Sequence, residues 1–435
     1  MTPDELAAAL RRGDAGLFVG ETAESALGWL HPERYLGGWL SEIEGKLPRR
    51  HPRTLLLGMG GSSSPARFYA EASGDGSLTV LDTSNPDTVS STDFSRANVI
   101  ASSKSGSTVE TQTLLAHALA NGLETSDLVI ITDPGTALEE MGRFLGALVV
   151  TGDPHIGGRF SALSPFGLVP ALYAGWSSSS LAEELGDVIV SDTLVAEADD
   201  YARACLEHSP GEATFVELAG DPVTSGSSLW LEQLLAETTG KSGVGVVPLT
   251  GAGGRYRPRD MMRWHLVAAL LARRLGVDPF NQPNVESAKR DVFALLSRSA
   301  TRPTSDSSIT SELLASARYR TLQVYAPLDA SEAVADLRRV VESRFGPTTA
   351  NVGPRYLHST GQLHKGGPAG VVAVQVIVRP LSTPTRIQGR AYSFHDLHRA
   401  QAASDERAMR AVGREVRVLE VDSVGEAAGL LESAS

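Results

Sequence analysis

The chain has 435 residues, of which 42% are hydrophobic and 21% charged, a composition typical of a globular protein with two or three domains. The formal net charge of −12 and the lack of a basic stretch argue against nucleic acid or an anionic membrane as a partner. The single cysteine, Cys205, excludes an internal disulfide framework, and no apolar run is long enough to span a membrane, so we expect a cytoplasmic protein.

In the first half of the chain, short apolar runs alternate with polar turns and helical stretches. The expected strands are a run that starts at Thr54, and Leu78–Leu81, Asn98–Ala101, Leu128–Ile131 and Ala147–Val150, with helices over Pro65–Ala72 and Thr108–Asn121. This alternation predicts a parallel α/β sheet that is covered by helices on both faces. In such sheets ligands bind at the carboxyl ends of the strands, where the polar turns lie.

A second series of elements follows the serine run Ser177–Ser180, which is typical of a loop or linker. Its expected strands are Ala213–Leu218, Val244–Leu249, Leu322–Tyr325, Val371–Val378 and Val416–Val421, and its helices are Asp187–Glu207, Ser228–Thr238, Asp260–Leu275, Ala330–Phe345 and Phe394–Val412. Because the halves follow the same pattern, we expect two parallel α/β units, over residues 1–180 and 181–435. We expect Ser297–Ser308 to be a mobile loop.

The first candidate ligand-binding turn is Gly58-Met-Gly60-Gly61-Ser62-Ser63-Ser64, between a strand and a helix. A dinucleotide-binding turn is one interpretation, but Ser63 stands where the third glycine belongs. A tight turn that offers amides and hydroxyls from Gly60, Gly61 and Ser62 to a small polar ligand fits better.

The second candidate turn is Ser102-Ser-Lys-Ser-Gly-Ser-Thr108, which joins a strand to a helix. Hydroxyls, an ammonium group and the amides of a helix N-terminus converge there, which favours an anion. The spacing is not that of a nucleotide-binding P-loop. We therefore expect a phosphomonoester site, although an ordinary capped helix start remains the alternative. Its candidate residues are Ser103, Lys104, Ser105 and Thr108.

Together with Gly157-Gly-Arg-Phe-Ser161, these turns resemble the run of motifs in phosphoglucose isomerases, which consist of two sugar-isomerase (SIS) domains. The resemblance continues through Gln233–Lys241 and Phe280–Lys289. The C-terminal stretch around Leu357–Pro368 is most similar to the isomerase half of fused transaldolase/phosphoglucose isomerase proteins. The resemblance implies a homodimer with two doubly wound, SIS-type parallel-sheet domains that have helices on both faces.

The resemblance also implies roles for single residues. Glu237 is the base that moves a proton between two carbons, with Gln233 one helical turn before it on the same face. Arg159 stabilises an enediolate oxygen, Lys289 helps to open the sugar ring, and Gln282 touches the phosphate. The alternatives are a solvated glutamate for Glu237, a surface ion pair for Arg159, and an exposed glutamate–lysine pair for Lys289.

The ring-opening histidine departs from the family's pattern. Between the segments of the base and the lysine lies only His265, whose apolar helical surroundings predict a core residue. His358 and His364, on a glycine-rich stretch further along, are the candidates, because imidazole titrates near neutral pH. Pro283-Asn284-Val285 replaces the family's aromatic–glycine pair, which leaves the shape of the substrate open.

The sequence therefore predicts an enzyme that interconverts glucose 6-phosphate and fructose 6-phosphate through an enediol(ate). We expect no cofactor and no metal, since this isomerisation requires neither, and we interpret His395 and His398 as a helix-surface pair. Two alternatives stay open. One is an isomerase of a different phosphorylated sugar, and the other is a non-catalytic protein that senses a sugar phosphate.

Overall fold

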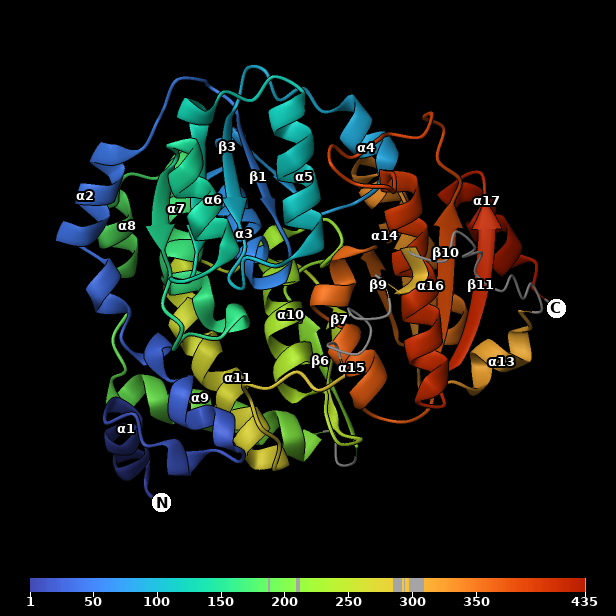
Figure 1. The fold of residues 1–435 in the computed structure, drawn as a ribbon. Coiled ribbons are helices and arrows are strands. Elements are labelled where there is room, and N and C mark those ends of the chain that lie inside the picture. Colours follow the sequence, from blue (N-terminus) through green and yellow to red (C-terminus); the bar gives the residue numbers. More distant parts are fainter. Residues whose placement is uncertain (187, 209–211, 285–291, 293, 297–308, 435) are drawn as a thin grey trace.

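The computed structural model describes residues 1–186, 188–208, 212–284, 292, 294–296 and 309–434. Two separate parallel sheets dominate it, one in each half of the chain, and Figure 1 shows them on opposite sides of helix α10 (Gly226–Thr239). The expected mobile loop, 297–308, lies outside the described residues.

The first sheet has five parallel strands in the order β2-β1-β3-β4-β5. Their bounds are Thr54–Gly58 (β1), Leu78–Leu81 (β2), Asn98–Ser102 (β3), Leu128–Thr132 (β4) and Leu148–Thr151 (β5). Leu56 pairs with Ile100 in a core cluster on one face, whereas Leu55 and Leu57 belong to another cluster. Since neighbouring residues of a strand point to opposite faces, both faces of this sheet are covered.

Nine α-helices lie in the described part of the chain between residues 3 and 208, and α3 to α6 alternate with the strands of the first sheet as expected. The nine are α1 (Pro3–Arg11), α2 (Gly38–Lys46), α3 (Ser64–Ser73), α4 (Pro86–Ser91), α5 (Val109–Ala120), α6 (Ala137–Leu145), α7 (Pro165–Tyr173), α8 (Ser178–Leu185) and α9 (Asp192–His208). The interpretation of Ser177–Ser180 as a loop was wrong. Ser177 is the N-cap of α8 in a capping box with Ser180, because serine hydroxyls satisfy the free amides of a helix start.

The strands of the second half form a four-stranded sheet, β11-β10-β8-β9, and a two-stranded one, β6-β7, all parallel. Their bounds are Ala213–Leu218 (β6), Gly245–Thr250 (β7), Tyr319–Tyr325 (β8), Thr348–Val352 (β9), Val371–Val378 (β10) and Glu415–Val421 (β11). Separate core clusters again cover the two faces of the larger sheet. Two parallel α/β units are thereby confirmed, with the second divided into two sheets.

The remaining helices are α11 (Met261–Leu275), α13 (Ser311–Ser316), α14 (Ser331–Phe345), α15 (Gly361–Gly366), α16 (Phe394–Ala411) and α17 (Val424–Glu432). Helix α10 is buried along almost its whole length and packs against α3 and α11 on one side and β7 and α15 on the other. The largest hydrophobic cluster runs from Leu6 to Phe280 and draws on residues on both sides of position 180. The domain boundary there stays a prediction.

None of the helices in the described part of the chain is long and apolar enough to cross a membrane.

Candidate functional site

A cavity of about 370 Å³ lies where the carboxyl ends of β1, β3 and β4 meet helix α10. Seven segments line it, and they are separated by as much as about 300 residues in the sequence. The lining residues are Met59, Gly60, Gly61, Ser62, Lys104, Ser105, Thr108, Asp133, Gly157, Gly158, Arg159, Gln233, Glu237, Gln282 and His358.

Two glycines allow three of these segments to approach one another. Gly60 has a φ of +55°, and a Cβ on it would lie 2.5 Å from the carbonyl oxygen of His358. A Cβ on Gly61 would lie 2.0 Å from the carbonyl oxygen of Gly158. No residue with a side chain fits either position, so the glycines bring Arg159 and His358 to the cavity.

The start of α5 forms the polar end of the cavity. Thr108 is the N-cap, yet its side chain makes no capping hydrogen bond; its Oγ1 lies 2.9 Å from the Oγ of Ser103. Thr108 therefore does not occupy the first amides of this 12-residue helix. Such a helix start attracts an anion through its free N–H groups and its dipole.

Lys104 is held at the wall of the cavity. Its Nζ forms an ion pair with Asp133 and donates to the carbonyl oxygen of Asp153 at 3.0 Å. Burial raises the pKa of Asp133 above its usual value, and the ammonium of Lys104 opposes that effect. Lys104 thus joins the loop Ser102–Thr108, called the anion loop below, to the end of β4.

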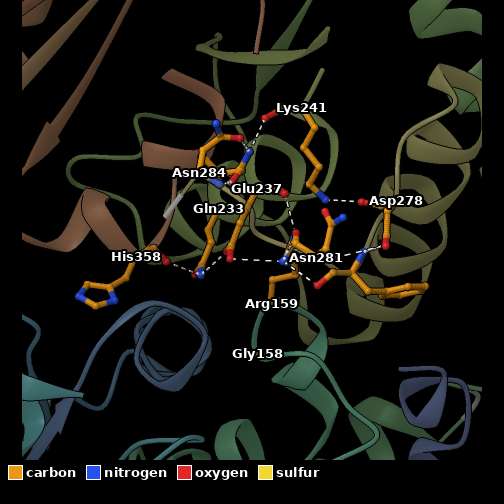
Figure 2. A network of polar contacts seen from close by, with 12 residues as sticks. Gly158, Arg159, Gln233, Glu237, Lys241, Asp278, Asn281, Asn284 and His358 are labelled. Atoms are coloured by element: carbon orange, nitrogen blue, oxygen red, sulfur yellow. Dashed lines mark hydrogen bonds and ion pairs between the residues drawn. The ribbon is translucent and has the colours of Figure 1, made fainter. Parts of the chain in front are cut away.

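Glu237 and Gln233 point into the cavity from one face of α10. Gln233 Nε2 donates to Glu237 Oε2 and to the carbonyl oxygen of His358, each at 3.0 Å, while its Oε1 accepts from Ser64 Oγ at 2.6 Å (Figure 2). Gln233 therefore fixes the orientation of the Glu237 carboxylate. Only 3% of Glu237 is exposed, so the carboxylate acts in an environment from which water is largely excluded.

Arg159 lies beside Glu237 and is fully buried. Its Nη2 is 3.5 Å from Glu237 Oε1 and donates to the carbonyl oxygens of Phe280 and Asn281, while Nη1 donates to the carbonyl oxygen of Glu237 itself. Burial lowers the pKa of Arg159, and the Glu237 carboxylate opposes that effect. The guanidinium is a fixed positive charge next to the carboxylate.

His358 approaches from the 3-10 turn η10 (Arg355–His358). Its Nε2 lies 2.8 Å from Oε1 of Glu110, and Gln401 donates to the same oxygen. A histidine that is oriented by a carboxylate is a suitable group for moving a proton to or from an oxygen atom.

The structure separates the two histidine candidates. His364 lies on α15, does not line the cavity, and packs against Tyr319 and Thr321, with its Nε2 3.1 Å from Thr321 Oγ1. Burial, with Lys365 and Arg414 nearby, lowers the pKa of His364 to about 3. Of the two candidate histidines, His358 therefore lines this cavity and His364 does not, because the ring of His364 packs against the second sheet.

The other predicted residues have different outcomes. Gly60, Gly61, Ser62, Lys104, Ser105, Thr108 and Gln282 line the cavity, and Ser103 lies behind it through its bond to Thr108. Lys289 lies outside the described residues. His265 is a core residue, as expected: it is packed between Trp29, Phe160 and Trp230, and burial lowers its pKa to about 3.

Two residues of the site, Glu110 and Asp133, were not predicted from the sequence. Glu110 is an acidic residue in the first turn of the helix after the anion loop, and Asp133 directly follows strand β4. Their positions at the carboxyl edge of the sheet could have indicated the site. Their partners could not be predicted, because His358 is 248 residues from Glu110 and Lys104 is 29 residues from Asp133. Within the described residues, no group of three or more His, Cys, Asp or Glu could hold a metal ion.

The fold and the cavity define a parallel α/β protein with a polar, ligand-sized site at strand ends. No protein-family model matches the chain. The glucose-6-phosphate isomerase of Campylobacter jejuni is 26% identical over 221 residues, which are 46% of this chain and 54% of that protein. The glucose-6-phosphate isomerase of Rubrobacter xylanophilus is 31% identical over 163 residues, or 34% of this chain and 38% of that protein.

These alignments span about half the length, or less, of the curated relatives that the chain matches. Over that part, the predicted resemblance to phosphoglucose isomerases is confirmed. The closer resemblance to fused transaldolase proteins stays a prediction. A solved glucose-6-phosphate isomerase from Chlamydia trachomatis superposes with 16% identity, covering 98% of this chain and 72% of that one, but its TM-score of 0.31 is too low to support an inference.

Proposed function

We propose that the protein is an aldose–ketose isomerase that interconverts glucose 6-phosphate and fructose 6-phosphate. One observation carries this proposal: Glu237, Arg159, His358 and the loop that leads into α5 line a single cavity. The reaction needs a base, a cation, a ring-opening group and a phosphate anchor, and these four features can supply them. The names of the curated relatives support the same reaction.

The phosphate anchors at the start of α5 in this proposal. The hydroxyls of Ser105 and Thr108 donate to the phosphate oxygens, and the dipole of the helix that begins there favours their negative charge. Gln282, on the opposite wall, contributes an amide donor. The sugar then extends from the anion loop toward α10.

Ring opening is the task of His358. The protonated imidazole gives its proton to the ring oxygen as the bond between C1 and that oxygen breaks, and the C1 hydroxyl returns its proton through a water molecule to the imidazole. The carboxylate of Glu110 stabilises the charged ring of His358 before the transfer. By resemblance to the family, Lys289 assists in this step.

Glu237 then removes the proton from C2 of the open-chain aldose and returns it to C1, while the hydroxyl proton on O2 passes to O1. The intermediate is an enediol(ate), and the buried guanidinium of Arg159 stabilises its negative oxygen. Because Gln233 and Arg159 already orient the carboxylate, little reorganisation is needed in the reacting complex.

The Glu237→Gln substitution tests the proposal. Removing a general base lowers turnover by about 10²–10⁴-fold, so we expect kcat to fall by that factor in a coupled assay with either hexose phosphate. Substrate-dependent stabilisation against heat should persist, since the phosphate anchor is untouched.

The matched control for this test is Glu232→Gln, on the same helix. Glu232 is buried and does not line the cavity, and burial raises its pKa to about 8, so it is mostly protonated near pH 7 and glutamine mimics that form. Glu232→Gln should keep wild-type turnover. Undiminished turnover in Glu237→Gln would refute the assignment of the base.

The choice of sugar is tested with a panel of hexose and pentose phosphates in heavy water. We expect glucose 6-phosphate to exchange its C2 proton for deuterium while fructose 6-phosphate forms. Faster turnover of another sugar phosphate would identify a different isomerase, and binding without any exchange would identify a sensor.

The resemblance to the family also leads us to propose a homodimer, a cytoplasmic location, and a domain boundary near residue 180. Light scattering on the purified chain should give twice the monomer mass of 45.9 kDa. A monomer that retains full turnover would contradict the dimer.

A further inference from the structure

A second cavity, of about 420 Å³, lies at the carboxyl ends of strands in the other half of the molecule. Residues that follow β6, β8 and β9 line it, together with β2 and α3 of the first half. The two cavities share no lining residue, although η10 contributes Arg355 to this one and His358 to the first. Ligands of parallel α/β sheets bind at such strand ends, in crevices of this kind.

Two arginines line this cavity and share one buried carboxylate. Arg67 Nε and Nη2 donate to the two oxygens of Asp82 at 2.9 and 2.6 Å, which is a bidentate pair. Arg355 Nη1 lies 3.7 Å from Oδ2 of the same Asp82, which is completely buried. Arg67 therefore forms the closer pair with the carboxylate, and Arg355 has only a longer contact with it.

Two of the three guanidinium nitrogens of Arg355 lack a hydrogen-bond partner among the described residues. Its side chain is 4% exposed, and in the described part of the chain neither Nε nor Nη2, both shielded from solvent, has a hydrogen-bond partner. A buried guanidinium without acceptors is unfavourable, since its donors have lost water and gained nothing in exchange.

The other nearby carboxylates do not supply the missing acceptor. Glu71 accepts from Ser225 Oγ and the amide of Ser227, so it caps the start of α10. Asp329 is exposed at the mouth of the cavity. Glu232 accepts from Asn351, and burial raises its pKa to about 8, so near pH 7 it contributes little negative charge beside Arg355.

We propose that this second cavity binds a small phosphate-bearing anion between Arg67 and Arg355. The two guanidinium groups come from different elements and offer donors from two directions, which suits a tetrahedral oxyanion better than a planar carboxylate. Thr224 and the exposed Asp329 at the rim can accept or donate hydrogen bonds to hydroxyl groups, so the occupant is either free phosphate or a phosphate monoester of a small polyol. The site goes beyond the proposed isomerase activity and does not depend on it.

Titration calorimetry of the full chain with inorganic phosphate and with glycerol 3-phosphate tests the proposal. Thr79 lines the cavity, is exposed, and lies outside the first cavity, so Thr79→Glu adds a competing carboxylate and Thr79→Gln adds a matched neutral group. We expect two binding events in the wild type. Thr79→Glu should weaken one of them at least tenfold, and Thr79→Gln should change it less than threefold.

Two further variants assign that event. Arg355→Met should abolish it with the circular dichroism spectrum unchanged, and the double substitution Ser105→Ala, Thr108→Val should remove only the other event. Equal binding to Thr79→Glu and Thr79→Gln would overturn the proposal, as would a single event that the loop substitutions abolish. Tighter binding of glycerol 3-phosphate would identify a monoester as the occupant, and equal binding would identify free phosphate.

Discussion

Two glutamates of α10 show how position on one helix separates the roles of identical side chains. Glu232 and Glu237 are five residues apart, so they point in directions about 140° apart around the helix axis. Glu232 faces Asn351 of the second sheet, whereas Glu237 faces Arg159 and the cavity. Both side chains are buried, so it is the neighbouring groups that distinguish Glu232, a structural acid, from Glu237, the candidate base.

The histidines give a prediction at this scale. His358→Gln should slow the isomerisation of cyclic glucose 6-phosphate by about 10²-fold or more, because the group that moves the ring proton is lost. An open-chain aldose phosphate that cannot form a ring should be converted at close to the wild-type rate. Stopped-flow measurements with the two kinds of substrate check the difference.

The matched variant is His364→Gln, which should leave both rates unchanged, since that ring contacts Thr321 and not the cavity. If His364→Gln slowed the cyclic substrate and His358→Gln did not, the assignment made from the cavity would be reversed.

At the scale of elements, the proposed function makes the start of helix α5 the anchor for the phosphate. Removing one hydroxyl that contacts a charged group costs about 1.5–3 kcal/mol. We therefore expect Thr108→Val to raise KM for glucose 6-phosphate by about 10–150-fold and to change kcat little, because the contact is the same in the ground state and the transition state.

Steady-state kinetics check this expectation, with Ser107→Ala as the control, because Ser107 is exposed and does not line the cavity. A drop in kcat at constant KM for Thr108→Val would contradict a purely anchoring role.

The elements that the sequence predicted well are those with strong local signals. Strand Leu78–Leu81 and strand Ala213–Leu218 were predicted residue for residue, since each apolar run ends at a polar turn. Strand β9, Thr-Thr-Ala-Asn-Val, was missed because it contains no continuous apolar run, and it is buried only by its neighbours in the sheet. Ser177–Ser180 was misassigned because serine favours both loops and helix starts.

Most residues of the site could be predicted from the sequence, but the contacts between them could not. Glycines, hydroxyls and the spacing of Gln233 and Glu237 are visible in the sequence. The bond of His358 to Glu110 joins residues 248 apart, and nothing local distinguishes His358 from His364. Only the packing of the two halves decides which ring reaches the cavity.

At the scale of the whole molecule, three buried histidines make stability depend on pH. Burial lowers the pKa of His265, His364 and His398 from 6.5 to about 3. The interpretation of His398 as a helix-surface residue was wrong, because its ring packs against Tyr325 and contacts Ser84 in the interior. Below pH 6.5 the three histidines therefore bind protons in the unfolded chain but stay neutral in the folded chain, until the pH approaches 3. Stability is fully present above pH 6.5 and is lost toward pH 3, at about 1.4 kcal/mol per pH unit for each ring. Urea unfolding midpoints between pH 7 and pH 5 should fall accordingly.

The contribution of one ring is tested with His265→Phe. Neither ring nitrogen of His265 has a partner among the described residues, and its neighbours are aromatic, so phenylalanine can replace it. At pH 5 the variant should unfold at a higher urea concentration than the wild type, with a gain of about 2 kcal/mol relative to the difference at pH 7. A gain independent of pH would show that protonation of His265 does not limit stability.

The lining of the first cavity reaches from Met59 to His358, with contributions from both sheets. Contacts between such distant segments form late in folding, because closing long loops is entropically expensive. A nascent chain that has folded only its first half would thus carry the anion loop and Arg159 without the base Glu237 or the imidazole of His358. The proposed site is therefore complete only when both halves of the chain have folded. A ligand that binds across these segments should raise the free energy of unfolding of the whole chain.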